Sequence, residues 1–435
     1  MAYPKIPNLR HLVELLVCYS SLKHENGSEG IQNILDGVAK DLQAATKKLT
    51  GLKEDAALRA AEPDDLAGIR ALRPSGPRRL WQEFKPAEYR DRLAGALLAR
   101  MAGCTLGAPV EAWSIQDMAA LAKENRQPFP PTNYWKAAPY PWHKRYTVSE
   151  VREYTLGGMK GVPVDDDVEY TLLGLLIAED YGLDFTTADV GAGWKKYLPI
   201  ACTAEDVALR NLKKGISADK VGEVDNPFYQ WIGADIRSDP WAYMAPAQPE
   251  LAAELAYRDA YISHRRNGIY GEMFFSAAIS AAFAVDDPMQ ALEIGLTEIP
   301  RNCSLTKAVK WALKAAPKIK DYQQARAEVD KKFAGMHAVH TTNNACLTIF
   351  GLAIGGKDVT KVISQTVAMG LDNDCTAATA GSIVGACVGK AGVPSYWYKP
   401  FGDTIHTYLT KRPRFSIRDV LARFTRLAQE SFSAK

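Results

Sequence analysis

The chain has 435 residues, more than a single domain usually contains, which favours one large body with an appended segment. Its hydrophobic fraction of 47% is ordinary for a globular protein. Lys and Arg total 53 and Asp and Glu total 50, so the formal charge is only +3. This leaves no positive surplus to hold a nucleic-acid backbone or an anionic membrane, and we expect neither partner.

Helical periodicity begins in the first part of the chain, as in Leu42, Ala45 and Leu49. The Pro/Gly/Arg stretch Arg73–Arg79 then predicts a boundary, so we expect an N-terminal helical extension over residues 1–82 and a main body over 83–435. The extension fits a partner-docking element, an oligomerisation element or a helical brace, and its sequence does not choose among them.

Wide apolar faces at helical spacing predict the helices of the main body, and strand signals are sparse. We therefore expect an all-α fold. The predicted helices are Tyr89–Val110, Val168–Asp180, Glu250–Ser263, Gly271–Ala284, Ser304–Ala315, Thr341–Ile354 and Thr376–Val388.

Cysteine usage and apolar segments favour a cytoplasmic protein. The seven cysteines are scattered and show no CxxC spacing, so we expect reduced thiols. The early apolar run His11–Cys18 is short, contains Glu14 and precedes no small-residue cleavage site, which argues against a secretion signal. No stretch reaches the roughly 18 uncharged apolar residues of a membrane-spanning helix. The longest candidate, Cys375–Gly389, is rich in Ala and Gly.

The segment Gln127–Trp142 contains many prolines and aromatic residues. Proline at this density excludes regular helix, and the aromatic rings offer stacking surfaces. Two interpretations fit equally well: a surface lid or binding loop, and a rigid structural crossover.

Three consecutive aspartates, Asp165, Asp166 and Asp167, stand immediately before an amphipathic helical pattern. Acids in the first turn of a helix cap free N–H groups and meet the positive end of the helix dipole, which accounts for one or two of them. Three adjacent carboxylates repel one another unless a cation or solvent offsets the charge. The preceding Val-Pro-Val indicates that this turn begins inside the protein, so a bound metal is the simplest explanation.

A second acidic pair, Asp372 and Asp374, precedes a helix whose small residues predict unusually close packing against its neighbours. A solvated Asx turn is the alternative for this pair alone. Two such clusters together favour a hard cation, so we expect Mg²⁺, with Mn²⁺ as the alternative ion. Zinc is disfavoured because His264, His337 and His340 show no ligand spacing beside Asp or Cys.

Four ordered segments resemble the ADP-ribosylglycohydrolase family, from about residue 88 to the C-terminus. Asp91–Glu111 resembles the family's opening "DRIxGALLGxAxGDALGxPxE", and Asp165–Glu169 stands in place of "TDDTxM". Gly233–Arg237 with Ser263-His264 resembles "GAxMR" followed by a Thr-His pair, and Gly370–Cys375 stands in place of "GxDxDT". One such segment is weak evidence, whereas four in order are specific.

The resemblance implies a compact orthogonal helical bundle with two magnesium ions between the acidic clusters. It implies that Asp166, Asp167, Asp372 and Asp374 match the metal-binding acids, and that Glu111 matches an acid close to the metals that handles the attacking water. Three departures alter the expected site: Cys104 replaces the Asp of "GD", Asp165 replaces a threonine, and Cys375 replaces the last threonine. Asp165 adds charge, and Cys375 offers a soft sulfur or its backbone carbonyl to the metal.

The phosphate-binding segment departs further. Relatives carry a glycine-dense "GNGGAMR", whereas this chain has Tyr229–Arg237. Bulk at Trp231 and negative charge at Asp235 oppose the approach of a pyrophosphate, so we expect a smaller ribosyl compound as an alternative to an ADP-ribosylated protein. Arg237 and His264 are, with Gly233, the candidates for binding an anion or a ribose hydroxyl. For each of the two taken alone, a structural Arg and a core His are the favoured interpretations.

We therefore expect a magnesium-dependent hydrolase that cleaves an N- or O-glycosidic bond at C1 of a ribosyl group, with Glu111 or Asp372 as the base. The first rival is a catalytically impaired module that binds ADP-ribose or a ribosyl compound, although the retained carboxylates argue against it. The second is an isoprenoid synthase, because Asp165-Asp166-x-x-Glu169 resembles "DDxxD/E". Its second motif needs an acid where this chain has Ser382, so we discount it.

Overall fold

We analysed a computed structural model of the chain that describes residues 3–433. The chain divides into two compact units, Met1–Ala60 and Ala61–Lys435. Each unit is described by itself.

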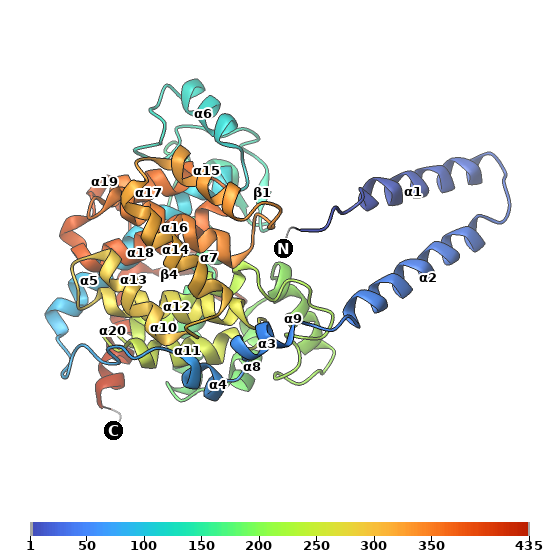
Figure 1. Cartoon of the computed structure of the whole chain (residues 1–435). Coiled ribbons are helices and arrows are strands. Elements are labelled where there is room, and N and C mark those ends of the chain that lie inside the picture. Colours follow the sequence, from blue (N-terminus) through green and yellow to red (C-terminus); the bar gives the residue numbers. More distant parts are fainter. Residues whose placement is uncertain (1–2, 434–435) are drawn as a thin grey trace. The chain divides into compact units, whose positions relative to one another are not determined.

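The first unit is an antiparallel helical hairpin of α1 (Leu9–Glu25) and α2 (Ile31–Thr50), as Figure 1 shows. Asn8 caps α1 through its side-chain oxygen, and Gly27 and Gly30 take the left-handed backbone conformation that the turn requires. None of the described residues of α1 or α2 is buried. The short helix α3 (Ala56–Ala61) leads into the second unit.

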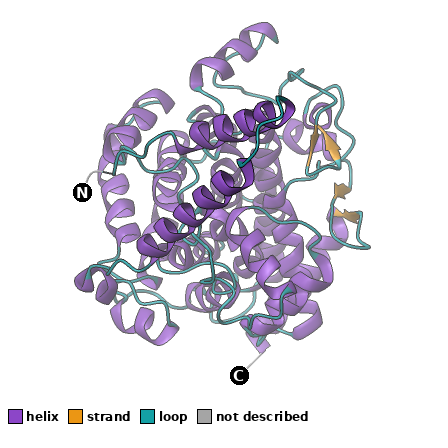
Figure 2. Cartoon of the chain, turned by 90° about the vertical axis from the view of Figure 1, so that its right-hand side faces the viewer, coloured by secondary structure: helices purple, strands orange, loops and turns teal. Residues whose placement is uncertain are grey.

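The second unit consists of α-helices and short 3₁₀ turns with two very small β-hairpins (Figure 2). The hairpins pair β1 (Lys144–Arg145) with β2 (Ser149–Glu150), and β3 (Thr404–His406) with β4 (Arg414–Ser416). The remaining α-helices are α4 (Leu66–Leu72), α5 (Pro86–Gly107), α6 (Ile115–Glu124), α7 (Asp166–Tyr181), α8 (Thr187–Tyr197), α9 (Thr203–Lys213), α10 (Ser238–Met244), α11 (Pro249–Ala260), α12 (Asn267–Ala282), α13 (Pro288–Gly295), α14 (Ser304–Ala315), α15 (Tyr322–Lys332), α16 (Thr341–Gly355), α17 (Val359–Ala368), α18 (Asn373–Val388), α19 (Ser395–Tyr398) and α20 (Ile417–Ser433).

The prediction of an all-α fold is confirmed, and each predicted helix of the main body is present with ends shifted by a few residues at most. The body extends beyond the predicted boundary at residue 82, because the compact unit starts at Ala61. Glu62 is buried and accepts a hydrogen bond from the Ser304 backbone N–H at 2.7 Å, and Arg73 pairs with Glu298 at 2.6 Å. Residues 61–82 therefore pack on the helical body.

Helices α5 and α18 form the centre of the body and pack closely through small residues, as the sequence of α18 predicts. A Cβ atom added at Gly103 or Gly381 would collide with the backbone of the opposite helix, and one at Gly107 would lie 2.5 Å from the Asp374 Cα. Only glycine allows two backbones to approach in this way. This contact fixes the start of α18 beside the end of α5.

Among the described residues, Pro86–Val110 is the one helix long and apolar enough to cross a membrane, and its apolar 18-residue window is wholly buried within the body. Its packing against α18 is typical of a core helix.

Candidate active site

The first acidic cluster lies at the start of α7. Asp165 is the N-cap, and its Oδ1 accepts a hydrogen bond from the Asp167 backbone N–H at 3.3 Å. Asp166 and Asp167 occupy the first turn, where the helix dipole favours negative charge. Asp165 and Asp167 are almost completely buried, which agrees with the expectation that this turn begins inside the protein.

The second acidic cluster lies at the start of α18 and follows a strained turn. Gly370 and Leu371 both have positive φ, of 71° and 60°, and the left-handed conformation is unfavourable for leucine. The Leu371 carbonyl accepts a hydrogen bond from the Ala112 backbone N–H at 3.0 Å. This bond ties the turn before Asp372 to the segment that carries Glu111.

The two clusters open into one pocket of about 540 Å³. This volume lies within the range of small-molecule sites. The acids that line it are Glu111, Asp166, Asp167, Glu205, Asp372 and Asp374. The structure thus brings four of the predicted metal-binding carboxylates together from two distant segments and adds Glu111, the predicted base, from a third, whereas Asp165 does not line this pocket.

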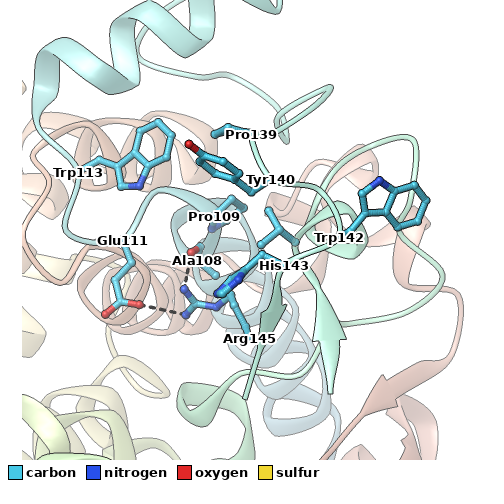
Figure 3. Close-up of a pocket in the computed structure, with 10 residues that line it drawn as sticks. Ala108, Pro109, Glu111, Trp113, Pro139, Tyr140, Trp142, His143 and Arg145 are labelled. Atoms are coloured by element: carbon cyan, nitrogen blue, oxygen red, sulfur yellow. Dashed lines mark hydrogen bonds and ion pairs between the residues drawn. The ribbon is translucent and has the colours of Figure 1, made fainter. Parts of the chain in front are cut away.

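Arg145 lies among these acids, and sequence reasoning missed it. Its Nη2 is 3.0 Å from Glu111 Oε2, 3.0 Å from Asp165 Oδ2 and 3.2 Å from Asp374 Oδ2. Its Nη1 donates to the Ala108 carbonyl at 2.7 Å, and Figure 3 shows this bond and the pairing with Glu111. The available signal was the third aspartate, because an added buried acid calls for a compensating cation.

Burial and mutual repulsion shift the pKa values of the acids. Burial raises the pKa of Asp166 to about 7, with the Asp165 charge as the next contribution. Burial, followed by neighbouring carboxylates, raises the pKa of Asp167, Asp372 and Asp374 well above the usual range. These carboxylates therefore tend to take up protons in the absence of a further cation, although Arg145 lies beside them and Arg100 lies 4.0 Å from Asp167. An added cation would favour their charged form.

Two groups of side chains have the proximity that metal ligation needs. One ligand atom each of Glu111, Asp372 and Asp374 lies within 4.8 Å of the others, and the same holds for Cys104, Asp165 and Asp167. In the described part of the chain, Asp167 Oδ1 and Asp374 Oδ1 are buried oxygens without a hydrogen-bond partner. Unpaired buried carboxylate oxygens are costly unless a cation binds them, so the all-oxygen group fits a hard divalent ion.

The cysteines fit such an ion poorly. Burial raises the pKa of both Cys104 and Cys375, with nearby aspartates as the next contribution, so both are expected as neutral thiols. A hard cation prefers oxygen to sulfur, and metal ligation requires a deprotonated thiol. The proposed ligand role of Cys375 thus depends on its backbone carbonyl.

The predicted substrate-binding residues differ in their surroundings: Gly233 lines the acidic pocket, whereas the others contact neighbouring protein side chains. Arg237 is buried and pairs with Glu205, Asp259 and Glu272, at 2.6, 2.7 and 3.4 Å.

His264 and Trp231 also have protein partners in this region. His264 is fully buried, with Nδ1 2.8 Å from the Ser263 hydroxyl, and burial lowers its pKa. The ring of Trp231 stacks on His337 with centroids 4.0 Å apart. Each of these contacts holds its side chain in a defined position, and the predicted roles toward a ligand stay predictions.

A second pocket of about 580 Å³ shares Glu111, His143 and Arg145 with the acidic one. Figure 3 shows Trp113 and Tyr140 above Glu111 and Arg145 in that view. Pro139, Tyr140 and Trp142 belong to the Pro-rich segment, which therefore contributes a wall of this pocket.

The structure is thus a helical body with an acid-lined pocket between the starts of two helices. Residues 85–432 match the ADP-ribosylglycohydrolase family, and the chain belongs to that family. This membership confirms the resemblance and removes the main support for an isoprenoid synthase.

A solved structure described as an "ADP-ribosylglycohydrolase-related protein complex" is similar to this chain at 18% identity and a TM-score of 0.54. The match covers 79% of this chain and 99% of the other, and at this identity it shows the fold alone. No curated protein matches the chain.

Proposed function

We propose that this protein is a divalent-metal-dependent hydrolase that cleaves the N- or O-glycosidic bond at C1 of a ribosyl group, with Mg²⁺ as the expected ion. The observation that carries the proposal is the meeting of carboxylates from three segments in one pocket, where Asp374 and Asp167 keep oxygens that have no hydrogen-bond partner among residues 3–433. Family membership supports the reaction class.

A bound divalent ion lowers the pKa of a coordinated water and orients the vicinal hydroxyls of a ribose. Asp167 and Asp374, held at the first turns of α7 and α18, would hold the ion. Glu111 is the best-placed base, because its side chain is 38% exposed, lines the pocket and lies within ligand distance of Asp372 and Asp374. Asp372 is the alternative base.

The wall of the pocket near Gly233 supports a substrate smaller than an ADP-ribosylated protein. The carboxylate of Glu205 packs against Gly233, so that a Cβ there would collide with it. Asp235 is not among the residues that line the pocket, and its Oδ2 accepts a hydrogen bond from the buried Thr341 hydroxyl. The carboxylate beside this wall is therefore that of Glu205, which pairs with Arg237 and leaves little room at Gly233, whereas the sequence alone pointed to Asp235.

The aromatic pocket beside Glu111 supports a leaving group with a flat ring. Trp113 and Tyr140 offer planar apolar faces next to the candidate base, and Arg145 lies at the junction of the two pockets. A ribosyl compound could place its sugar among the acids and its ring between these side chains. A nucleobase or another planar heterocycle meets this requirement.

The second candidate is a module that binds ADP-ribose or a ribosyl compound without turnover. The position of Arg145 favours it, because the guanidinium occupies carboxylate oxygens that a catalytic ion would use. Calorimetric titration with ADP-ribose and with free ribosides, run beside a turnover assay, distinguishes binding from catalysis.

The test of the main proposal is a screen of ribosylated compounds with and without Mg²⁺ or Mn²⁺. Wild type is compared with Asp166→Ala and with Asp330→Ala, a surface acid paired with Arg326 that serves as the control. We expect metal-dependent release of the ring or side chain, its loss in Asp166→Ala and its retention in the control. Hydrolysis that ignores both the chelation of divalent ions and the Asp166 substitution would contradict the proposal.

A further inference from the structure

We propose that Arg145 serves as a resident cation in the acidic pocket, so that this protein binds one divalent ion where its family resemblance implies two. The inference rests on the proposed function, because it concerns the same pocket. It goes beyond that function by assigning the second positive charge to a side chain of the protein.

The surroundings of Arg145 are those of a bound cation. Its Nη2 lies 3.0 to 3.2 Å from three carboxylate oxygens, which belong to Glu111, Asp165 and Asp374. These acids come from three segments, and Nη1 is anchored on the Ala108 carbonyl. A nitrogen that collects one oxygen from each of three acids takes the ligands that a second metal ion would need.

The charge of the cluster explains why an arginine is needed there. Asp165 stands where the resembling motif has a neutral threonine, and Cys104 stands where it has an aspartate, so one buried negative charge lies at Asp165 instead of at position 104. Arg145 supplies one positive charge at 3.0 Å from Asp165. A buried charge is tolerated when it is paired, so Arg145 stabilises the acid in this place.

The remaining ligands suffice for one ion. Asp372 and Asp374 lie within ligand distance of each other, and Asp374 Oδ1 and Asp167 Oδ1 have no hydrogen-bond partner within the described residues. The group of Cys104, Asp165 and Asp167 combines an acid already paired with Arg145 with a buried thiol. A second divalent ion in that group would compete with the guanidinium for oxygen and would gain a soft, protonated ligand.

The hairpin that carries Arg145 is shaped for this position. Tyr146 and Thr147 both adopt the left-handed conformation, with φ of 48° and 62°, which is unfavourable for residues other than glycine. The Tyr146 hydroxyl donates to Asp166 Oδ1 at 2.7 Å, and the guanidinium lies near the rings of Tyr146 and Tyr154. These contacts offset the strain and hold the arginine among the acids.

The test is the stoichiometry of metal binding in the absence of substrate. Wild type, Arg145→Ala, Arg145→Lys and Arg152→Ala are titrated with Mn²⁺ by calorimetry and by electron paramagnetic resonance, which separates single ions from coupled pairs. Arg152 belongs to the same segment, pairs with Glu150 at the surface and serves as the control. Circular dichroism and thermal melting verify that each variant is folded.

We expect one ion in wild type, Arg145→Lys and Arg152→Ala, and two ions with a coupled-pair spectrum in Arg145→Ala. Two ions in wild type, or a single ion in folded Arg145→Ala, would overturn the inference and leave the proposed function standing. No bound ion in wild type at millimolar Mn²⁺ would overturn both.

Independently, we infer that the α1–α2 hairpin pairs with the same hairpin of a second copy of this chain. Within the hairpin, Leu16 and Ser20 of α1 and Leu35 and Val38 of α2 are partly covered. The other apolar side chains of α1 spread over a wider arc than one neighbouring helix can cover, and several are exposed by about half: Leu12, Val13, Leu15, Val17, Tyr19 and Leu22.

The charges on the hairpin fit a second hairpin in antiparallel orientation. At its turn, the acids Glu25, Glu29 and Asp36 outnumber Lys23, whereas Arg10, Lys47 and Lys48 lie at its open end. An antiparallel pair places each acidic turn beside a basic open end and buries the exposed apolar stripe in a four-helix arrangement.

Sedimentation velocity of the full chain tests this inference. We expect wild type to form a dimer. The double variant Leu12→Asp/Tyr19→Asp should have a dimer Kd at least about 10-fold higher, with the melting temperature and the metal stoichiometry unchanged. Leu52→Asp, an exposed residue outside both helices, is the control. A monomer at about 100 μM wild type, or a dimer unaffected by the double substitution, would refute the pairing.

Discussion

Two clusters in this protein combine an arginine with several buried acids, and they differ in completeness. Around Arg237, the acids Glu205, Asp259 and Glu272 each contact the guanidinium, and the Ser263 hydroxyl accepts a further bond at 3.0 Å. The rings of Tyr170 and Trp194 lie over its faces. Arg237 is only 1% exposed.

Around Arg145 the same ingredients leave the cluster open. The Arg145 side chain is 16% exposed and extends from a two-residue strand, and its Nε has no hydrogen-bond partner among the described residues. Among the same residues, Asp374 Oδ1 has no hydrogen-bond partner, and Asp167 Oδ1 has only the Arg100 guanidinium nearby, at 4.0 Å. The comparison teaches that a closed cluster braces the fold, whereas an incomplete one keeps ligands for a small ion.

The largest effect is expected when the arginine of the closed cluster is removed. Arg237→Met leaves Glu205, Asp259 and Glu272 without their shared cation, so we expect the free energy of unfolding to fall by about 3–5 kcal/mol. Urea denaturation followed by circular dichroism measures this change. The number of bound Mn²⁺ ions should stay the same in the folded variant, and a loss of metal with full stability would reverse the assignment.

Removing a proposed metal ligand from the open cluster should weaken metal binding and leave the stability of the metal-free protein nearly unchanged. Asp374→Ala is expected to weaken metal binding by at least about 100-fold, or about 2.7 kcal/mol, and to abolish turnover. It should leave the metal-free melting temperature nearly unchanged or higher, because it relieves repulsion among buried acids. Thermal melts with and without Mg²⁺ measure both effects, and an undiminished Mg²⁺-induced shift would contradict the ligand role.

A pH titration sharpens the comparison for Glu205, which belongs to the closed cluster. Burial raises the pKa of Glu205 from about 4.5 to about 6 in the folded protein. Between these values the unfolded chain releases the proton first, so stability should fall as the pH rises from about 4.5 to 6. Relative to Glu205→Gln, wild type should lose about 2 kcal/mol across this window. Parallel stability profiles of the two proteins would show that Glu205 does not titrate in this way.

The smallest effect is expected at the edge of the open cluster. Tyr146→Phe removes the hydrogen bond to Asp166, so we expect a loss of about 1 kcal/mol in metal binding, or a few-fold weaker affinity. Calorimetry with Mn²⁺ measures it. Tyr140→Phe, whose side chain is 82% exposed, is the matched control and should bind metal as wild type does.

The sequence predicted the helical body well because the signals are local. Apolar residues at helical spacing predicted the long helices, and the small residues of Asn373–Val388 predicted close packing of that helix, which the structure shows to be against α5. It also singled out the acids that share the pocket, since Asp165–Asp167 and Asp372–Asp374 stand where helices begin.

The remaining features of the site could not be predicted, because they depend on contacts between distant residues that leave no periodic pattern in the sequence. Arg145 reaches the acids from a short hairpin in an irregular segment, and nothing in Lys144–Thr147 distinguishes it from a surface turn. The inward rotation of Asp235 and the pairing of Arg237 are set by partners up to about a hundred residues away, such as Thr341. Charge balance around Asp165 was the one physical argument that pointed to a missing cation.

The contact of Gly107 with the Asp374 backbone has a consequence for how such a site can diversify. A single methyl group on α5 would displace the start of α18, so the two central helices tolerate almost no change in size where they cross. Variation that alters substrate choice without dismantling the acids must therefore accumulate in the irregular stretch between Gln127 and Glu150. That stretch supplies Tyr140, Trp142 and Arg145, and it is where relatives with new specificities should be sought.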